Sequence, residues 1–186
     1  MADVRTMLVR DESRLSLSEW IVLCLVCEQP THGLAVAALL ARDSTLGQIW
    51  YVPKAMVYRG MDRLERSGYI RTIGKEPSSH GPVRSLAQAT PAGQRAAKAW
   101  LAKPVAHPRD VRSELLIKLA LRDRIGADTS DLLLRQHAQL VPIAAVLSDR
   151  LHGATGFERT LALWRSESIS ATLRFLEAAG QPISSP

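Results

Sequence analysis

The stretch VPKAMVYRGMDRLERSGYI, residues 52–70, carries two interleaved stripes at the spacing of an α-helix. One stripe is apolar and the other cationic: Val57, Met61 and Leu64, and Arg59, Arg63 and Arg66. At about 100° per residue the stripes lie about 200° apart, so one can face a core while the other faces outward. The cationic stripe is either an ordinary solvated face or a surface built to lie against an anionic partner.

Helices and a hairpin are predicted around this stretch. The S-x-x-E capping box that begins at Ser16 starts a helix over about 17–28, which Pro30 ends. Thr31 is the expected N-cap of a short second helix, and residues 43–52 are expected to be a connection. Pro53 then suits the first turn of a third helix. Alternation at 69–74 and 83–90 predicts a hairpin, and this order is typical of a winged helix-turn-helix.

Beyond residue 90 the sequence predicts helices only. Thr90 and the proline after it start one helix, 110–124 forms another, and the last runs to Gly180. Leucines seven apart within 131–151 indicate a heptad seam for a partner helix, at positions Leu133, Leu140 and Leu147. The predicted fold class is mainly α with a small β-hairpin, a winged helix-turn-helix followed by a helical dimerisation region. The expected domains are 1–90 for DNA binding, 91–180 for dimerisation and 181–186 as a polar tail.

Charge favours an anionic partner. The chain has a formal net charge of +6, and residues 54–84 hold seven lysines and arginines against three acidic residues, a net +4. Guanidinium groups bond phosphate oxygens in pairs and can also bond the O6 and N7 atoms of guanine in a major groove that admits one helix. A basic third helix before a hairpin with a basic tip therefore predicts binding to double-stranded DNA.

Patterns that would indicate other functions fail on inspection. No signal peptide is evident, and the longest apolar run, residues 21–27, is too short for a membrane span, so we expect a soluble cytoplasmic protein without membrane partners. Cys24 and Cys27 have a redox or half-zinc spacing, but they lie in that apolar run without a second pair, which favours buried thiols. The histidines show no metal-paired spacing, and no phosphate loop or G-x-S-x-G is present. We expect no enzyme activity, no metal and no cofactor.

Four segments of the sequence resemble the PadR-like family of transcriptional regulators. They are HG at 32–33, the stretch at 52–70 with its R-L-E-x-x-G close, GPVRSLAQATPAGQ at 81–94 and PVAHPRDVRSELLIKLALRDR at 104–124. Their order and spacing carry the resemblance, which covers nearly the full length. Members of the family are dimeric repressors that a small ligand often releases from DNA. The resemblance therefore implies a homodimeric repressor that binds a palindromic operator through the third helix and wing, with a small-molecule effector.

The resemblance also implies which residues contact DNA. They fall on the recognition helix and the wing: Pro53, Lys54, Tyr58, Arg59 and Arg63, and His80 and Arg84. The wing departs from the common family pattern, because SLAQAT replaces the aromatic residue usual in its second strand. Tyr58 either places its hydroxyl on a phosphate or closes the groove between helix and wing. Trp100 and Trp164 either line a dimer interface or ligand cavity, or pack in the core.

A second interpretation uses the same fold for protein contact. The basic face would then dock an acidic protein, and the chain would show no preference among DNA sequences. An enzyme is the third interpretation, and it has no supporting motif. A competition experiment with different DNA sequences separates the first two interpretations.

Overall fold

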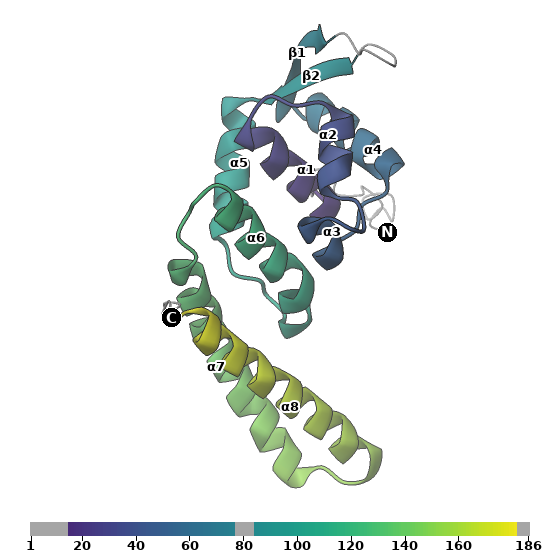
Figure 1. The fold of residues 1–186 in the computed structure, drawn as a ribbon. Helices are drawn as coiled ribbons and strands as arrows, with labels where there is room; N and C mark the ends of the chain where they lie inside the picture. Colours follow the sequence, from purple (N-terminus) through teal and green to yellow (C-terminus); the bar gives the residue numbers. More distant parts are fainter. Residues whose placement is uncertain (1–14, 77–83, 182–186) are drawn as a thin grey trace, which may run out of the picture. The chain divides into compact units, whose positions relative to one another are not determined.

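The computed structural model describes residues 15–76 and 84–181 (Figure 1). His80 and all but the first residue of the predicted polar tail lie outside these ranges. The chain divides into two compact units, residues 1–98 and residues 99–186, named here the N-terminal and C-terminal units. The predicted fold class is confirmed, because the described residues are mainly helical with one two-stranded antiparallel hairpin. No helix among the described residues is long and apolar enough to cross a membrane.

The first helix forms as its capping box predicts. Helix α1 spans Leu17–Glu28. The Ser16 hydroxyl accepts the backbone N–H of Glu19 at 3.4 Å, and the Glu19 carboxylate accepts the backbone N–H of Ser16 at 2.6 Å. The middle of α1, residues 21–26, is buried. This helix is therefore the centre of the N-terminal unit, and its start is fixed by local hydrogen bonds.

The second helix begins one residue later than expected. Helix α2 spans Gly33–Leu39, and its N-cap is His32, whose Nδ1 accepts the backbone N–H of Ala35 at 3.1 Å. The prediction of Thr31 as N-cap is wrong. Thr31 instead exchanges two backbone hydrogen bonds with Ala87 in the hairpin, at 2.9 and 2.8 Å. A backbone committed to the sheet cannot also open the helix, so the next residue takes the cap.

A short helix occupies the segment that was expected to be only a connection. Helix α3 spans Thr45–Ile49, and the hydroxyl of Ser44 accepts the backbone N–H of Gly47 at 3.0 Å. A side chain at Gly47 would place its Cβ 1.7 Å from the carbonyl oxygen of Ala41. The basic helix is consequently the fourth, α4, which spans Lys54–Arg66. Five residues are too few to show helical periodicity, and for that reason the sequence analysis missed α3.

The predicted hairpin follows α4. Strand β1 spans Ile70–Glu76 and strand β2 spans Arg84–Ala89, antiparallel, with an irregularity between Thr72 and Gly74. Ala87 and Ala89 are buried, so β2 packs one face against the helices and leaves the other outward. In Figure 1 the two strands extend beyond the helices of the N-terminal unit.

Among its described residues, the C-terminal unit has helices, joined by short connections, and no strand. Helix α5, Pro91–Ala102, leads into it, with the Thr90 hydroxyl accepting the Gly93 N–H at 3.1 Å as predicted for an N-cap. A 3-10 turn, a π-helical turn and helix α6 follow in place of one predicted helix, and two long helices complete the unit. Their bounds are Pro108–Asp110, Val111–Leu115, Leu116–Arg124, Ser130–Gly153 (α7) and Gly156–Ala179 (α8). Helices α7 and α8 lie side by side as an antiparallel pair (Figure 1).

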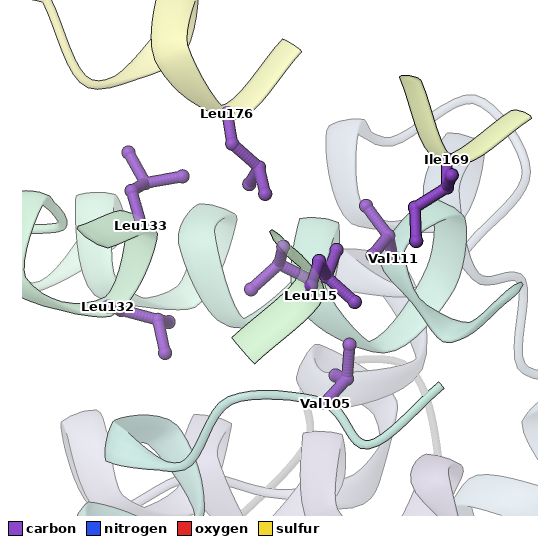
Figure 2. Packing of buried hydrophobic residues seen from close by; sticks show 8 residues of the cluster. Val105, Val111, Leu115, Leu132, Leu133, Ile169 and Leu176 are labelled. Carbon is purple, nitrogen blue, oxygen red and sulfur yellow. The ribbon is translucent and has the colours of Figure 1, made fainter. Parts of the chain in front are cut away.

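The leucine seam of α7 is used inside the chain. Leu133 and Leu140 are buried in one cluster with Ile169 and Leu176 of α8, and Leu147 packs against it (Figure 2). The same cluster holds Val105, Val111, Leu115 and Leu132. The seam was predicted to indicate a partner helix, and that helix is α8 of the same chain.

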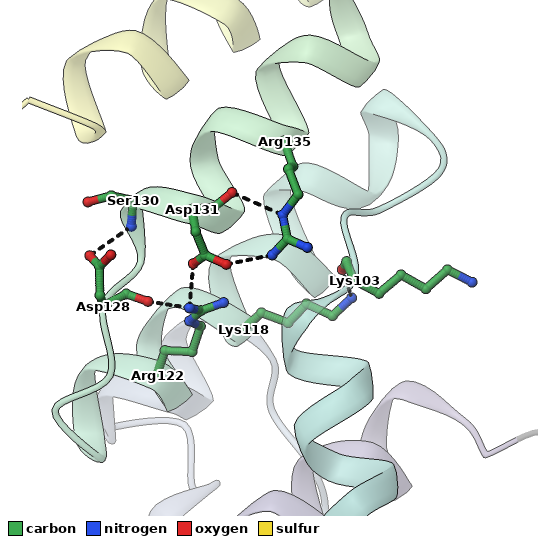
Figure 3. Close-up of polar contacts among 7 residues, drawn as sticks. All are labelled: Lys103, Lys118, Arg122, Asp128, Ser130, Asp131 and Arg135. Carbon is green, nitrogen blue, oxygen red and sulfur yellow. Dashed lines mark hydrogen bonds and ion pairs between the residues drawn. The ribbon is translucent and has the colours of Figure 1, made fainter.

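Polar groups tie the segments of the C-terminal unit together (Figure 3). Arg122 of α6 donates to the Asp128 carbonyl and bonds the Asp131 carboxylate at 2.5 Å. Asp131 also pairs with Arg135 at 2.6 Å. The backbone N–H of Ser130 donates to the Asp128 carboxylate and lowers the pKa of that carboxyl. The turn between α6 and α7 is therefore fixed by charge-assisted hydrogen bonds.

Replacement of Gly47 by alanine is expected to destabilise the chain. The added Cβ would meet the backbone of Ala41 rather than a movable side chain, so α3 must shift, at a cost of about 1 to 3 kcal/mol or more. Gly60→Ala is the matched control, since its Cβ would lie 3.7 Å or more from its neighbours and alanine favours a helix by about 1 kcal/mol. Urea unfolding should place the two variants on opposite sides of the wild type. A Gly47→Ala protein as stable as the wild type would contradict this description of α3.

Candidate nucleic-acid interface

Helix α4 presents an apolar face inward and a basic face outward. Val57 and Leu64 are fully buried. Lys54 and Arg59 are exposed, and among residues 15–76 and 84–181 neither has an ion-pair or hydrogen-bond partner. Cations without partners on one side of a helix can bind anionic oxygens without first breaking an internal bond.

Arg63, by contrast, is engaged within the N-terminal unit. Its Nη1 lies 3.1 and 3.2 Å from the two carboxylate oxygens of Glu19 on α1. Its side chain is 32% exposed, and that of Glu19 is 13% exposed. The three arginines that share helical spacing on α4 therefore differ in their surroundings, and Arg63 faces α1.

Tyr58 is held in place by the start of α2. A Cβ on Gly33 would lie 2.8 Å from Cε1 of Tyr58, so the absence of a side chain at Gly33 allows the ring to pack there. The tyrosine remains 43% exposed. The HG pair of the sequence thus has two roles, since His32 caps α2 and Gly33 makes room for a ring on α4.

The first turn of α4 has no side-chain cap. Pro53 occupies the N-cap position, is exposed, and provides no side-chain hydrogen bond. Lys54 follows as the first helical residue. The partial positive charge of the helix N-terminus and the Lys54 ammonium therefore add at the same end of α4.

The wing is joined to α4 by a side chain. Glu65 accepts the backbone N–H of Thr72 in β1 at 2.9 Å. Arg71 and Lys75 are exposed on β1, and Arg71 donates to the amide oxygen of Gln88 at 3.1 Å. Arg84 lies opposite Glu76 at the start of β2. Arg71 and Lys75 were not among the predicted contacts, although both are cations at or beside the alternating segment 69–74.

Among the described residues, the cysteines and acidic side chains do not form a metal site. Cys24 is buried, and burial raises the pKa of the Cys27 thiol to about 11, so this thiol stays protonated at neutral pH. Within the described residues, no group of three or more His, Cys, Asp and Glu side chains could hold a metal ion.

The two predicted tryptophans of the C-terminal unit have different environments. Trp100 is buried, and the ammonium of Lys118 lies 4.7 Å from its ring centroid. Lys118 is itself buried and bonds the Glu114 carboxylate and the Lys103 carbonyl, each at 2.7 Å (Figure 3 shows the contact with Lys103). Trp164 is 69% exposed. Trp100 thus packs within the unit, whereas Trp164 is open to contact.

Trp164 lines a cavity of about 890 Å³ in the C-terminal unit. Apolar side chains of α7 and α8 form much of its wall, among them Ile143, Leu147, Ile169 and Phe175. The cationic residues of the wall are Arg109, Arg112 and Arg165, with His107 beside them. None of the described residues that line the cavity is acidic. Its chemistry suits an apolar molecule with a negative charge.

The fold and the basic face of α4 define a class, the winged helix-turn-helix proteins with a cationic recognition helix. Residues 22–99 match the sequence model of the transcriptional regulator PadR-like family. The match covers 78 of the 186 residues, so the segment from α1 to α5 is similar to this family of transcriptional regulators.

Three of the solved structures similar to the chain come from Bacillus species. Bacillus subtilis PadR in complex with operator DNA is 18% identical, with a TM-score of 0.46, and the match covers 88% of this chain and 97% of that chain. The same protein with p-coumaric acid is 16% identical, with a TM-score of 0.40 and coverages of 88% and 93%. A PadR-like transcriptional regulator of Bacillus cereus is 18% identical, with a TM-score of 0.40 and coverages of 89% and 95%. No curated protein sequence matches the chain.

Proposed function

We propose that the chain is a homodimeric repressor that binds a palindromic operator through α4 and the wing. The observation that carries this proposal is the outward face of α4, where Lys54 and Arg59 have no partner among the described residues. The major groove is wide enough to admit one α-helix, and α4 is an amphipathic helix of 13 residues. A dimer that covers its operator excludes other proteins from the promoter, which in the cytoplasm would repress transcription.

The proposed contacts differ in kind along α4. Lys54 and Pro53 at the helix start approach a phosphate, where the helix dipole adds to the ammonium charge. Arg59, one turn later, reaches base edges and can bond guanine through two N–H groups. Tyr58, whose ring is packed against Gly33, directs its hydroxyl to a phosphate at the edge of the groove.

The wing is proposed to contact the flanking backbone. Lys75 and Arg71 on β1 are exposed cations that supplement the predicted contacts His80 and Arg84. Because Glu65 bonds β1 directly, the wing and α4 would approach the duplex with fixed relative positions. We propose that residues 1–90 bind DNA and that residues 91–180 form the dimer.

The proposed dimer contact is a second apolar stripe on α8. It repeats every three or four residues through Phe157, Leu161, Trp164, Ser168, Ala171 and Phe175. The four large apolar side chains are between 36% and 79% exposed, while the face that packs on α7 is buried at Ile169 and Leu176. An exposed heptad repeat indicates a partner helix, and a second copy of the chain supplies an identical one. The two winged helices of such a dimer would then bind two half-sites whose centres lie about 10 bp apart, or a multiple of that distance.

The cavity is the proposed effector site. Arg112 and Arg165 have no ion-pair partner among the described residues, so each is free to pair with an anionic ligand beside the apolar wall. Trp164 and Phe175 belong both to this wall and to the α8 stripe. A ligand that moves these rings would change the dimer contact and thereby the spacing of the two recognition helices.

The alternative of a protein-interaction module uses the same basic face. An acidic partner would bind Lys54 and Arg59 without regard to DNA sequence. Competition between an operator fragment and a shuffled fragment of equal length separates the two functions. Equal competition by both fragments would favour the protein-interaction module.

Arg59→Ala is expected to weaken operator binding by about 1 to 3 kcal/mol with the fold intact, because a bidentate base contact is lost. Lys54→Ala should weaken binding to all sequences and reduce the slope of log K against log salt by about one. Arg159→Ala on α8 is the control, since this arginine is exposed on a helix of the C-terminal unit. Fluorescence anisotropy over a salt series measures all three. Wild-type affinity in both α4 variants would exclude α4 as the recognition helix.

Trp164→Glu is expected to weaken dimerisation by about 2 to 4 kcal/mol, because it places a carboxylate at the centre of the apolar stripe. Arg159→Glu on the same helix adds the same side chain off the stripe and should leave the dimer unchanged. Sedimentation equilibrium reports the dissociation constant of each. Equal dissociation constants for the two variants would contradict the proposed interface.

The cavity is expected to bind 8-anilinonaphthalene-1-sulfonate, an apolar anion. Arg112→Ala and Arg165→Ala should each weaken binding of this probe roughly tenfold, since a charge-assisted bond is lost. N-phenyl-1-naphthylamine has a similar shape without the charge, and its affinity should not change in these variants. Fluorescence titration measures both probes. Equal losses for the charged and neutral probes would show that the arginines do not recognise charge.

A further inference from the structure

We infer that Arg63 orients the recognition helix through Glu19 and does not itself contact DNA. The inference rests on the proposed function, in which α4 enters the major groove. It revises the sequence-based assignment of Arg63 as a DNA contact. Arg63 is thus a positioning residue, and Glu19 is the group through which it acts.

The Glu19 carboxylate is held by the start of its own helix. It accepts the backbone N–H of Ser16 at 2.6 Å and the Ser16 hydroxyl at 2.9 Å. Both Ser16 bonds use the oxygen Oε2, and Nη1 of Arg63 bonds Oε1 at 3.1 Å and Oε2 at 3.2 Å. A carboxylate fixed in this way cannot follow a moving guanidinium. The ion pair therefore transmits the position of α1 to α4.

The pair lies one turn from Gly60, where α4 packs against α1. A Cβ at Gly60, one turn before Arg63, would be 3.7 Å from Cγ of Glu19 and 3.8 Å from Cγ2 of Val22. Gly60 and the buried Val57 and Leu64 pack this face of α4 by apolar contacts, which have no preferred direction. The ion pair one turn after Gly60 adds a directional bond between α4 and α1.

The other arginines of α4 do not share this role. Arg59 is exposed without a partner among the described residues, and Arg66 donates to the carbonyl of Asp62 in its own helix at 3.3 Å. To reach a phosphate, Arg63 would have to leave a carboxylate whose side chain is only 13% exposed. That departure would leave a poorly solvated negative charge close to the DNA. Arg63 therefore stays paired while Arg59 binds.

Positioning matters because base recognition is sensitive to small displacements. Side chains must reach base edges to within about 0.5 Å and 10–20° of their productive geometry. Phosphate contacts are less demanding, since they depend mainly on charge. Loss of the Glu19–Arg63 pair should therefore reduce sequence preference more than general DNA affinity.

Three variants of the full chain test the inference: Arg63→Ala, Glu19→Gln and the double variant. Glutamine retains the acceptor that the capping box needs but removes the charge. Each is titrated with an operator fragment and a shuffled fragment over a salt series, and circular dichroism checks folding. Lys54→Ala serves as the phosphate-contact control, and Arg63→Lys, which can keep the ion pair, serves as the rescue.

Arg63→Ala and Glu19→Gln should each lower operator affinity roughly 2- to 30-fold. The double variant should show no further loss, because both changes break the same interaction. Binding to the shuffled fragment and the salt slope should stay at wild-type values, whereas Lys54→Ala, which removes a phosphate contact, lowers the slope by about one. Arg63→Lys should recover part of the operator affinity. The direction in which Glu19→Gln changes operator affinity is decisive. Removal of a negative charge would by electrostatics alone strengthen DNA binding, whereas loss of the ion pair should weaken it.

Several results would overturn the inference while the proposed function stands. They are a reduced salt slope in Arg63→Ala, additive losses in the double variant, or tighter operator binding by Glu19→Gln. If the variants that lack the Glu19–Arg63 ion pair melt at a lower temperature but keep the wild-type ratio of operator to shuffled binding, the pair only stabilises the fold. A wild-type chain without preference for any operator would overturn the proposed function and this inference together.

Discussion

The packing of α4 on α1 is the contact on which the rest of the N-terminal unit depends. Gly60 brings the two helices close, and Val57 and Leu64 are buried on the same face of α4. Because this face is buried, the opposite face must be outward, and the basic residues there are available to a partner. The short helix α3 and the cap of α2 matter to function chiefly because they complete the packing around these two helices.

Much of the fold could be predicted from local chemistry. The capping box at Ser16, the N-cap Thr90 and the terminal Gly180 mark helix ends that the structure confirms, since caps depend on neighbouring residues alone. Helix α3 was missed because five residues are too few for a pattern. The N-cap of α2 was misplaced by one residue because the backbone of Thr31 bonds Ala87, far away in the sequence.

The candidate site was predictable as a helix but not residue by residue. Arg59 and Arg63 share one spacing, and only the tertiary structure brings Glu19, 44 positions earlier, to one of them. The leucine seam of α7 shows the same limit. A heptad pattern predicts a partner helix but does not say whether that helix belongs to the same chain, and here α8 covers it.

On α4, the residues that hold the helix in place differ from those proposed to contact DNA. This difference has a consequence for how such proteins could diversify. The residues that hold the helix, Arg63 and Glu65, each bond a fixed group of the N-terminal unit. Lys54 and Arg59 bond nothing among the described residues. If α4 binds DNA as proposed, substitutions at Lys54 and Arg59 break no internal bond of the described residues, so a duplicated copy of the gene can acquire a new operator in single steps while the protein stays folded.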